Sequence, residues 1–303
     1  MNFFDIQVNG YAGIDFNQDN LSRVDLLHAC GRLRRDGTAK VLATIITDHA
    51  DSMARRIETL ARLKTDNSLT DEVIAGIHIE GPFISDREGF RGAHPADAIR
   101  PADVGLMREL LTAGRGHIRL VTLAPEQDPS GATIRFLRDQ GVAVSAGHTD
   151  ASLEELRGAI RHGLSLFTHL GNACPASLPR HDNIIQRALF LRDQLILCFI
   201  ADGVHIPTFV LKNYLDLAGL ERSIVTTDAM AAAGLGPGRY KLGRWDIEVG
   251  PDRAARAPGG SHLVGSAASL PYVSQKLTEE LGLSESQVQA LCRDNPQRAL
   301  LIP

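Results

Sequence analysis

The sequence predicts a protein of the α/β class that folds as a (β/α)₈ TIM barrel. Short apolar runs alternate with helix-like segments from the first residues onward, and about eight such runs occur. With 303 residues and 44% hydrophobic content, the chain can build one barrel of roughly 250 residues. We therefore expect a single domain over residues 1–303, with the barrel at about 1–235 and a hairpin and C-terminal helices at about 236–303.

The expected strands are short and rich in apolar and β-branched residues. In chain order they are Phe3–Val8, Val41–Ile46, Val73–Ile79, Ile118–Leu123, Val142–Ala146, Leu164–Thr168, Leu195–Ala201 and Ile224–Thr227. Because a helix-like segment separates consecutive runs, the strands should be parallel and should close into a barrel.

Helix-terminating signals support the predicted helices. Asp128 and Pro129 can begin one helix, and Gly141 can end it before the next strand. Ser152 and Glu155 have the spacing of a capping box, which predicts the start of a second helix.

The pattern changes after Thr227 to a stretch rich in Gly and Pro. A hairpin is expected at Tyr240–Val249, followed by helices at about Ser266–Leu281 and Ser284–Arg293. We expect these helices to pack against the barrel.

The composition excludes several functional classes. The net charge of −4 provides no basic field for nucleic acid, and no apolar segment approaches the roughly 18 residues of a membrane span. The N-terminus has no basic region of a signal peptide, so a soluble cytoplasmic protein is expected. The four cysteines have no CxxC spacing, which favours reduced, buried thiols.

Polar residues follow the predicted strands, where the active site of such a barrel lies. They are Gln7, Asn9, Glu80, His148, His169, His205 and Asp228. One carboxylate and two imidazoles from this set could bind one divalent ion and leave a position open for water, as in hydrolytic zinc sites. The long spacing between these residues does not specify which of them are ligands.

Some residues near these positions have simpler explanations. His78 lies two positions before Glu80 and is expected to be a hydrogen-bonded core histidine, while the Gly81-Pro82 turn could orient Glu80 or merely end the strand. Asp228 could instead be the N-cap of a short helix. Four other histidines are expected in surface or loop positions without convergent partners: His49, His117, His162 and His262.

A series of segments connects these residues with a known family. They are DIQVNGYAGIDFN (Asp5–Asn17), HIEGPFIS (His78–Ser85), GAHP (Gly92–Pro95), AGHTDAS (Ala146–Ser152), THLGNACP (Thr168–Pro175), IADGVHI (Ile200–Ile206), TTDAM (Thr226–Met230), LVGSAASL (Leu263–Leu270) and NPQRAL (Asn295–Leu300). In this order they resemble the N-acetylglucosamine-6-phosphate deacetylase family of the amidohydrolase superfamily. The resemblance covers essentially the whole chain and implies a barrel of the metal-dependent amidohydrolase type.

The resemblance implies roles for individual residues. Glu80, His148 and His169 would bind the metal, and Asp228 would be the catalytic carboxylate. Some family members bind a second metal through a His-x-His pair, and Gln7 and Asn9 stand at those places here. Since neutral amides are poor substitutes for imidazole, a single ion is expected, with Gln7 lining the substrate pocket. Zinc is the leading choice, although Fe²⁺, Co²⁺ and Mn²⁺ also suit these ligands.

The resemblance also implies substrate contacts. The GAHP segment would supply Ala93 and the catalytic His94, which would contact the acetamide carbonyl. The residues implied around the phosphate are Asn172, Ala173, His205 and Arg180 of the partner subunit. A homodimer is the expected assembly, since twofold dimers are the commonest symmetric oligomers.

The sequence departs from the family pattern in two respects. The small β domain of the relatives is expected to be missing, because the chain begins at the first barrel strand and ends at Pro303. The segment His-Leu-Phe-Asn-Ala-Met of the family reads His-Leu-Gly-Asn-Ala-Cys here, with Gly171 and Cys174 at the variable positions. This exchange predicts a reshaped or more open sugar pocket.

The function implied by the resemblance is removal of the acetyl group from N-acetylglucosamine 6-phosphate, which yields glucosamine 6-phosphate and acetate. One alternative is a deacetylase of another N-acetylated amino sugar, with or without phosphate. Another is a barrel that binds a sugar phosphate without catalysis. In each case the partner is a small amino sugar.

Overall fold

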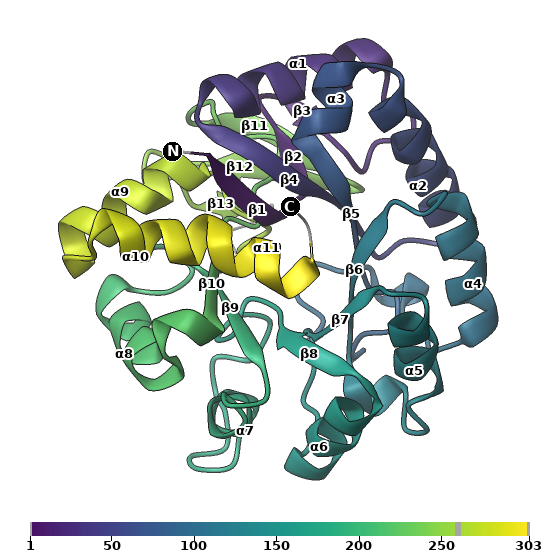
Figure 1. Cartoon of the computed structure of the whole chain (residues 1–303), viewed down its shortest axis with the longest axis vertical. Coiled ribbons are helices and arrows are strands. Elements are labelled where there is room, and N and C mark those ends of the chain that lie inside the picture. The colour runs from purple at the N-terminus through teal and green to yellow at the C-terminus, as the bar shows by residue number, and fades with distance from the viewer. Residues whose placement is uncertain (1, 258–261, 302–303) are drawn as a thin grey trace.

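Eight parallel strands form the central sheet of the computed structural model, which describes residues 2–257 and 262–301. Each barrel strand pairs with the next one along the chain, and the helices surround them, as Figure 1 shows. The prediction of a (β/α)₈ barrel is confirmed. The barrel strands are β1 (Phe3–Val8), β4 (Thr38–Ile46), β5 (Ile74–Glu80), β6 (Ile118–Leu123), β7 (Ala143–Ala146), β8 (Leu164–Phe167), β9 (Ile196–Ile200) and β10 (Ser223–Thr226).

All eight strands lie within a few residues of their predicted positions. The largest change is in β4, which begins at Thr38 rather than Val41 because Thr38 and Lys40 pair with β1. Glu80 is the last residue of β5 rather than the residue after it, since it still pairs with Thr122 of β6.

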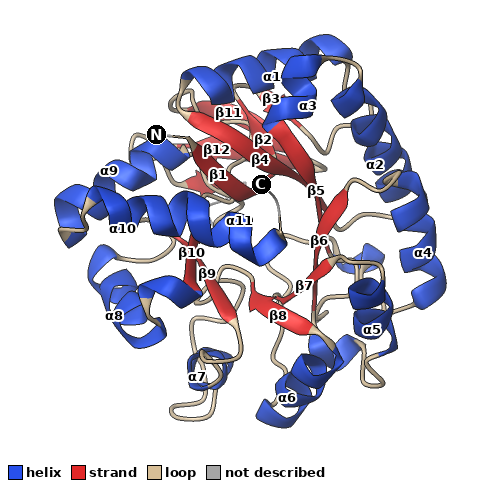
Figure 2. Ribbon diagram, in the orientation of Figure 1, coloured by secondary structure: helices blue, strands red, loops and turns tan. Residues whose placement is uncertain are grey.

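Helices connect the strands and cover the outside of the barrel (Figure 2). They are α1 (Arg23–Arg35), α2 (Ala50–Thr65), α3 (Ser68–Val73), α4 (Val104–Ala113), α5 (Ala132–Asp139), α6 (Leu153–His162), α7 (Ile184–Phe190), α8 (Thr208–Ala218), α9 (Leu270–Leu281), α10 (Glu285–Gln289) and α11 (Asn295–Leu300). Short 3₁₀ turns occur at Ala96–Ala98, Pro125–Gln127 and Leu220–Arg222.

The predicted helix starts are confirmed where a capping box was present. Ser152 and Glu155 cap α6 reciprocally, and Gly163 ends it. By contrast, α5 begins at Ala132, several residues after Asp128, because Gly131 has a positive φ of 65° just before the helix. Asp128 still supports this helix, since its carboxylate accepts a hydrogen bond from the Ile134 amide.

The segment after β10 begins with small strands. β11 (Gly238–Leu242) and β12 (Trp245–Val249) form the expected hairpin, to which β13 (Ala255–Arg256) adds a third strand. Two further residue pairs form near the start of the chain, as β2 (Gly10–Tyr11) with β3 (Ile14–Asp15).

The C-terminal helices differ from the prediction in their limits. The first begins at Leu270 with Ser269 as its N-cap, and not at Ser266, whose backbone instead bonds to Asp228 and Met230 in the loop after β10. The second is interrupted by a π-helical turn at Ala290–Asp294 and then continues as α11. In Figure 1, α11 crosses the end of the barrel at which the strands begin.

The barrel interior is built in layers, because alternate residues of each strand point inward. The layer nearest the strand starts is apolar and packs against Leu300 of α11; it contains Phe4, Ile6, Leu42, Leu120, Leu166, Cys198 and Ile224. The next layer is polar and hydrogen-bonded. His78 bonds to the hydroxyls of Thr44 and Thr122, and a chain of hydroxyl bonds continues through Thr168 to Ser145.

Asp5 of β1 joins the first and last strands of the barrel. Its carboxylate accepts hydrogen bonds from the Thr226 and Thr227 hydroxyls, both at 2.5 Å, and from the Thr227 amide at 3.2 Å. Beyond this point Val8 forms a bridge with Ala229. Hydrogen bonds to a buried carboxylate therefore close the barrel where the regular ladder of the sheet is absent.

Two predictions from composition can be compared with the structure. In the described part of the chain, no helix is long and apolar enough to cross a membrane. The cysteines are free, and Cys30, Cys198 and Cys292 are buried while Cys174 is half-buried.

We predict that Asp5→Ala lowers the free energy of unfolding by about 3 kcal/mol, because it leaves buried donors of Thr226 and Thr227 without an acceptor. Urea denaturation would measure this change. Asp246→Ala is the control, since Asp246 is exposed and its ion pair with Lys241 should contribute at most about 1 kcal/mol. Equal stability of the two variants would show that Asp5 does not close the barrel.

Candidate functional site

A cavity of about 230 Å³ lies at the carboxyl ends of the barrel strands. Most of the residues predicted for the site line it, namely Glu80, Ala93, His94, His148, His169, Asn172, Ala173, His205 and Asp228. Residues far apart in the sequence are thus brought to one place by the barrel topology, as the positions of the strand ends predicted.

The carboxylate of Glu80 lies at the centre of the site. Its Oε1 atom is 3.0 Å from Nε2 of His169 and 3.3 Å from Nε2 of His148. The Gln7 side-chain amide donates a 2.9 Å hydrogen bond to the same oxygen. Burial alone would raise the pKa of Glu80, but the hydrogen bonds and charges of the two histidines hold it well below its ordinary value.

The turn after β5 orients Glu80. Gly81 has a φ of 88°, and a Cβ atom there would lie 2.0 Å from the Thr47 hydroxyl oxygen, so only glycine fits. That hydroxyl donates a hydrogen bond to the backbone carbonyl of Glu80. The Gly81-Pro82 turn therefore does more than end the strand.

The two histidines reach Glu80 from strained positions. His148 has a φ of 50° and His169 a φ of 33°, a region that residues other than glycine seldom occupy. Nδ1 of His148 is 3.0 Å from the Phe90 carbonyl oxygen and donates to it, so Nε2 is the ring nitrogen that faces Glu80.

Glu80, His148 and His169 could hold a metal ion together. Each is buried, and the ligand atoms they offer all lie within 4.8 Å of one another. A carboxylate with two imidazoles is a common donor set for divalent transition metals at catalytic sites. The donor set and its burial fit one divalent cation, and the structure does not identify which one.

His94 lies beside this group. Its ring is 4.3 Å from that of His148, and its Nε2 atom is 3.8 Å from Oε2 of Glu80. Burial and the neighbouring His148 lower the pKa of His94 to about 3, so the ring is neutral at physiological pH. Its Nδ1 atom has no hydrogen-bond partner among the described residues.

Asp228 follows β10 and lies on another side of the cavity. Its Oδ1 atom accepts a 2.6 Å hydrogen bond from the Asn9 amide. Burial, and then the nearby charge of Glu80, raise the pKa of Asp228 to about 7. No helix begins at Asp228, and its φ of 53° belongs to a strained loop, so it is not an N-cap.

His205 lines the cavity and is held by a carboxylate. Its Nδ1 atom is 2.7 Å from Oδ2 of Asp202, which also accepts a hydrogen bond from the Ser266 hydroxyl. Burial would lower the pKa of His205, but Asp202 outweighs this effect and raises it. For Asp202 the directions are reversed. Burial would raise the pKa of this carboxyl, but its hydrogen bonds to His205 and the charge of that ring lower it to about 2.

Other predicted residues lie outside the cavity lining or at its edge. Gln7 is buried beneath the cavity, where it contacts Glu80, and Asn9 takes the place at the wall that was expected for Gln7. Arg180 is exposed and does not line the cavity of this chain. Gly171 has a φ of 91°, and a Cβ atom there would lie 3.3 Å from the Tyr214 ring. Cys174 lines the cavity.

The simpler explanations hold for His78, a buried histidine with both ring nitrogens hydrogen-bonded to threonine hydroxyls. Burial lowers its pKa to about 4. His49 is exposed and pairs with Asp97. His262 is exposed as expected, but it also lines the cavity, so the expectation that it lacks convergent partners is wrong.

Sequence reasoning missed Asp202, although it stands two residues after the end of β9, where polar residues were sought. Its position within IADGVHI was the available signal. Residues of the segment after β13 were also missed as parts of the cavity wall, since Leu263, Val264 and Gly265 follow no barrel strand.

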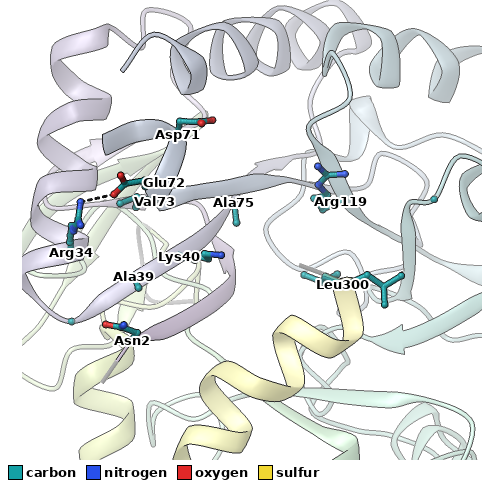
Figure 3. A pocket seen from close by; sticks show the side chains of 13 residues that line it. Asn2, Arg34, Ala39, Lys40, Asp71, Glu72, Val73, Ala75, Arg119 and Leu300 are labelled. Atoms are coloured by element: carbon teal, nitrogen blue, oxygen red, sulfur yellow. Dashed lines mark hydrogen bonds and ion pairs between the residues drawn. The ribbon is translucent and has the colours of Figure 1, made fainter. Parts of the chain in front are cut away.

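A larger cavity of about 720 Å³ lies at the opposite end of the barrel, where the strands begin (Figure 3). Its lining includes Lys40, Arg119 and an ion pair between Arg34 and Glu72 with an N–O distance of 2.9 Å. It contains none of the residues predicted for the site. Size is therefore a poorer guide to function here than the chemistry of the smaller cavity.

The chain is similar to curated deacetylases. It is 33% identical over 298 residues to the N-acetylglucosamine-6-phosphate deacetylase of Bacillus subtilis, covering 98% of this chain and 74% of that protein. It is 33% identical over 300 residues to the human protein of the same name, covering 95% of this chain and 71% of the human protein. No family model matches the chain.

The solved structures that are similar to this chain include deacetylases of the same name. A mutant of the Mycobacterium smegmatis N-acetyl-D-glucosamine-6-phosphate deacetylase, in complex with N-acetyl-D-glucosamine 6-phosphate, has a TM-score of 0.90 and 32% identity. The similarity covers 100% of this chain and 77% of that one. The N-acetylglucosamine-6-phosphate deacetylase of Thermotoga maritima has a TM-score of 0.86 and 26% identity, with 99% and 78% covered.

We predict that His148→Ala reduces divalent-metal binding, because it removes one of three buried donors. The affinity should fall by more than the roughly 10- to 100-fold that loss of an outer partner costs. Elemental analysis after dialysis against defined zinc concentrations would measure it, with His28→Ala, an exposed histidine of α1, as the control. Unchanged metal content in His148→Ala would contradict the proposed ligand set.

Proposed function

This chain belongs to the N-acetylglucosamine-6-phosphate deacetylase family, and we propose that it hydrolyses the acetamide of N-acetylglucosamine 6-phosphate with one divalent cation held by Glu80, His148 and His169. The observation that carries this proposal is one cavity holding that buried donor set together with Asp228, His94 and His205. The family membership supplies the substrate class.

Glu80, His148 and His169 would hold the cation, which would lower the pKa of a bound water toward neutrality and would polarise the amide carbonyl. Gln7 orients Glu80 through its hydrogen bond and, like Asn9, is too poor a donor to hold a second ion. One ion per chain follows.

Asp228 transfers the proton in this proposal. As the water attacks the carbonyl carbon, Asp228 accepts the proton of the water, and it then gives this proton to the departing nitrogen as the C–N bond breaks. A pKa near 7 suits both steps, because the group can gain and lose a proton near neutral pH. Neutral His94 donates a hydrogen bond to the oxyanion.

The phosphate is bound at the other end of the cavity. We assign it to Asn172, Ala173 and His205, which all line the cavity, and the raised pKa of His205 favours its positively charged ring. We place Arg180 of the partner subunit at the same phosphate, so the active assembly is a homodimer. The exposure of Arg180, outside the cavity of its own chain, supports a role in a neighbouring copy.

The remaining proposals concern metal, domain and location. Zinc is the proposed ion, because its open three-ligand sites commonly contain two histidines and a glutamate. Residues 1–303 act as one domain, supported by the hairpin residue Leu242 in the cavity wall. Four free cysteines support a cytoplasmic location, since reducing compartments keep thiols free.

We predict that Asp228→Asn lowers kcat by roughly a hundredfold to ten-thousandfold, because the amide cannot accept the water proton. Metal content should be unchanged, since Asp228 is not in the ligand set. Acetate release from N-acetylglucosamine 6-phosphate measures activity, with the exposed Asp193→Asn as the control. Turnover of Asp228→Asn near that of the unmodified enzyme would refute its role in proton transfer.

We predict that kcat/KM for N-acetylglucosamine 6-phosphate exceeds that for N-acetylglucosamine by roughly a hundredfold or more, because charge-assisted hydrogen bonds to the phosphate are lost. N-acetylgalactosamine 6-phosphate belongs in the same assay. A 26% identical relative from Escherichia coli O157:H7 is an N-acetylgalactosamine-6-phosphate deacetylase. Preference for that sugar would favour this alternative, and absence of acetate release from any substrate would favour a non-catalytic binding barrel.

A further inference from the structure

We propose that Asp202 is a positioning residue for phosphate recognition: its carboxylate fixes the His205 ring so that the Nε2–H group of that ring faces the substrate phosphate. The inference rests on the proposed function, because it assigns the phosphate to the His205 end of the cavity. Asp202 itself does not line the cavity, so it would act through His205.

The geometry leaves His205 one orientation. Asp202 accepts hydrogen bonds from the backbone amides of Val204 and His205, both at 2.8 Å, through Oδ1. Its Oδ2 atom lies 2.7 Å from Nδ1 of His205. Since Nδ1 is occupied by the carboxylate, Nε2 is the ring nitrogen that remains for a ligand.

Burial makes this contact strong. The side chains of Asp202 and His205 are only 4% and 7% exposed, so solvent competes weakly for their hydrogen bond. The carboxylate stabilises the doubly protonated ring, which is the form that offers both a charge and a donor to a phosphate. A neutral ring held by an uncharged partner would offer the phosphate no positive charge and a weaker hydrogen-bond donor.

A second residue holds the carboxylate itself. The Ser266 hydroxyl donates a 2.9 Å hydrogen bond to Oδ2 of Asp202, and the Ser266 amide donates to the Asp228 carbonyl at 2.8 Å. Ser266, which holds the Asp202 carboxylate, is therefore also hydrogen-bonded to the backbone of Asp228.

Among the residues that the structure describes, Asp228 and Lys276 are further charged groups that act on this pair. Asp228 faces His205 from the end of β10 and favours its protonated form. Lys276 of α9 interacts with Asp202 from the outside, and it pairs with Glu280 on the same helix. Asp202 is the charged group bonded directly to the ring, so its removal should dominate any change in the protonation of His205.

The test is Asp202→Asn, which keeps the side-chain shape but removes the charge and one of the two acceptor oxygens. We expect KM for N-acetylglucosamine 6-phosphate to rise roughly tenfold to a hundredfold, with kcat within about twofold and with KM for N-acetylglucosamine unchanged. Ser266→Ala, a milder change, should raise the same KM by less. Asp216→Asn, an exposed residue of α8, is the matched control and should change neither constant.

Two further readouts separate positioning from simple structural damage. KM for the phosphorylated substrate should rise with increasing pH as His205 loses its proton, and this rise should begin at lower pH in Asp202→Asn. Nitrogen NMR of the His205 ring, assigned with His205→Asn, should show deprotonation at correspondingly lower pH in Asp202→Asn.

Equal increases of KM for both substrates, or an unchanged KM and ring titration in Asp202→Asn, would overturn the role of Asp202. Failure of the proposed function would look different. The unmodified enzyme would then turn over N-acetylglucosamine and its 6-phosphate equally well, whatever Asp202→Asn does.

Discussion

The buried carboxylate of Glu80 is the constraint on which the rest of the site depends. A carboxylate with only 4% of its side chain exposed is stable only if donors or cations surround it. Gln7 supplies one donor, and two imidazoles face the same oxygen. Both histidines that face this oxygen have a positive φ, so backbone strain is concentrated at His148 and His169.

The barrel beneath this group is built to hold it rigidly. The hydroxyls and the His78 ring of the polar interior layer hydrogen-bond to one another and so limit the orientations of these side chains. Closure by Asp5 matters for the same reason. Gln7 and Asn9 come from the first strand and the turn after it, and Asp228 follows the last strand, so these groups stay together only if the two strands are joined.

Much of the fold could be predicted because its signals are local. Apolar runs located the strands within a few residues, and the capping box of Ser152 and Glu155 located the start of α6. The start of α5 was misplaced because a glycine with positive φ delays it, a property of the three-dimensional turn. The π-helical turn after α10 likewise has no pattern in the sequence that distinguishes it from a regular helix.

The residues of the site could be predicted only where the barrel topology determines their position. Because parallel strands end at one rim, the residues after them must converge, which is why Glu80, His148, His169 and Asp228 meet. Asp202 and Ser266 come together only through folding. Their spacing in the sequence does not predict the hydrogen bond from the Ser266 hydroxyl to the Asp202 carboxylate. The segment after β13 shows the same limit more clearly. It follows no barrel strand, yet it supplies cavity wall at Val264 and binds the backbone of Asp228 through Ser266, so the active site depends on residues outside the repeating βα pattern.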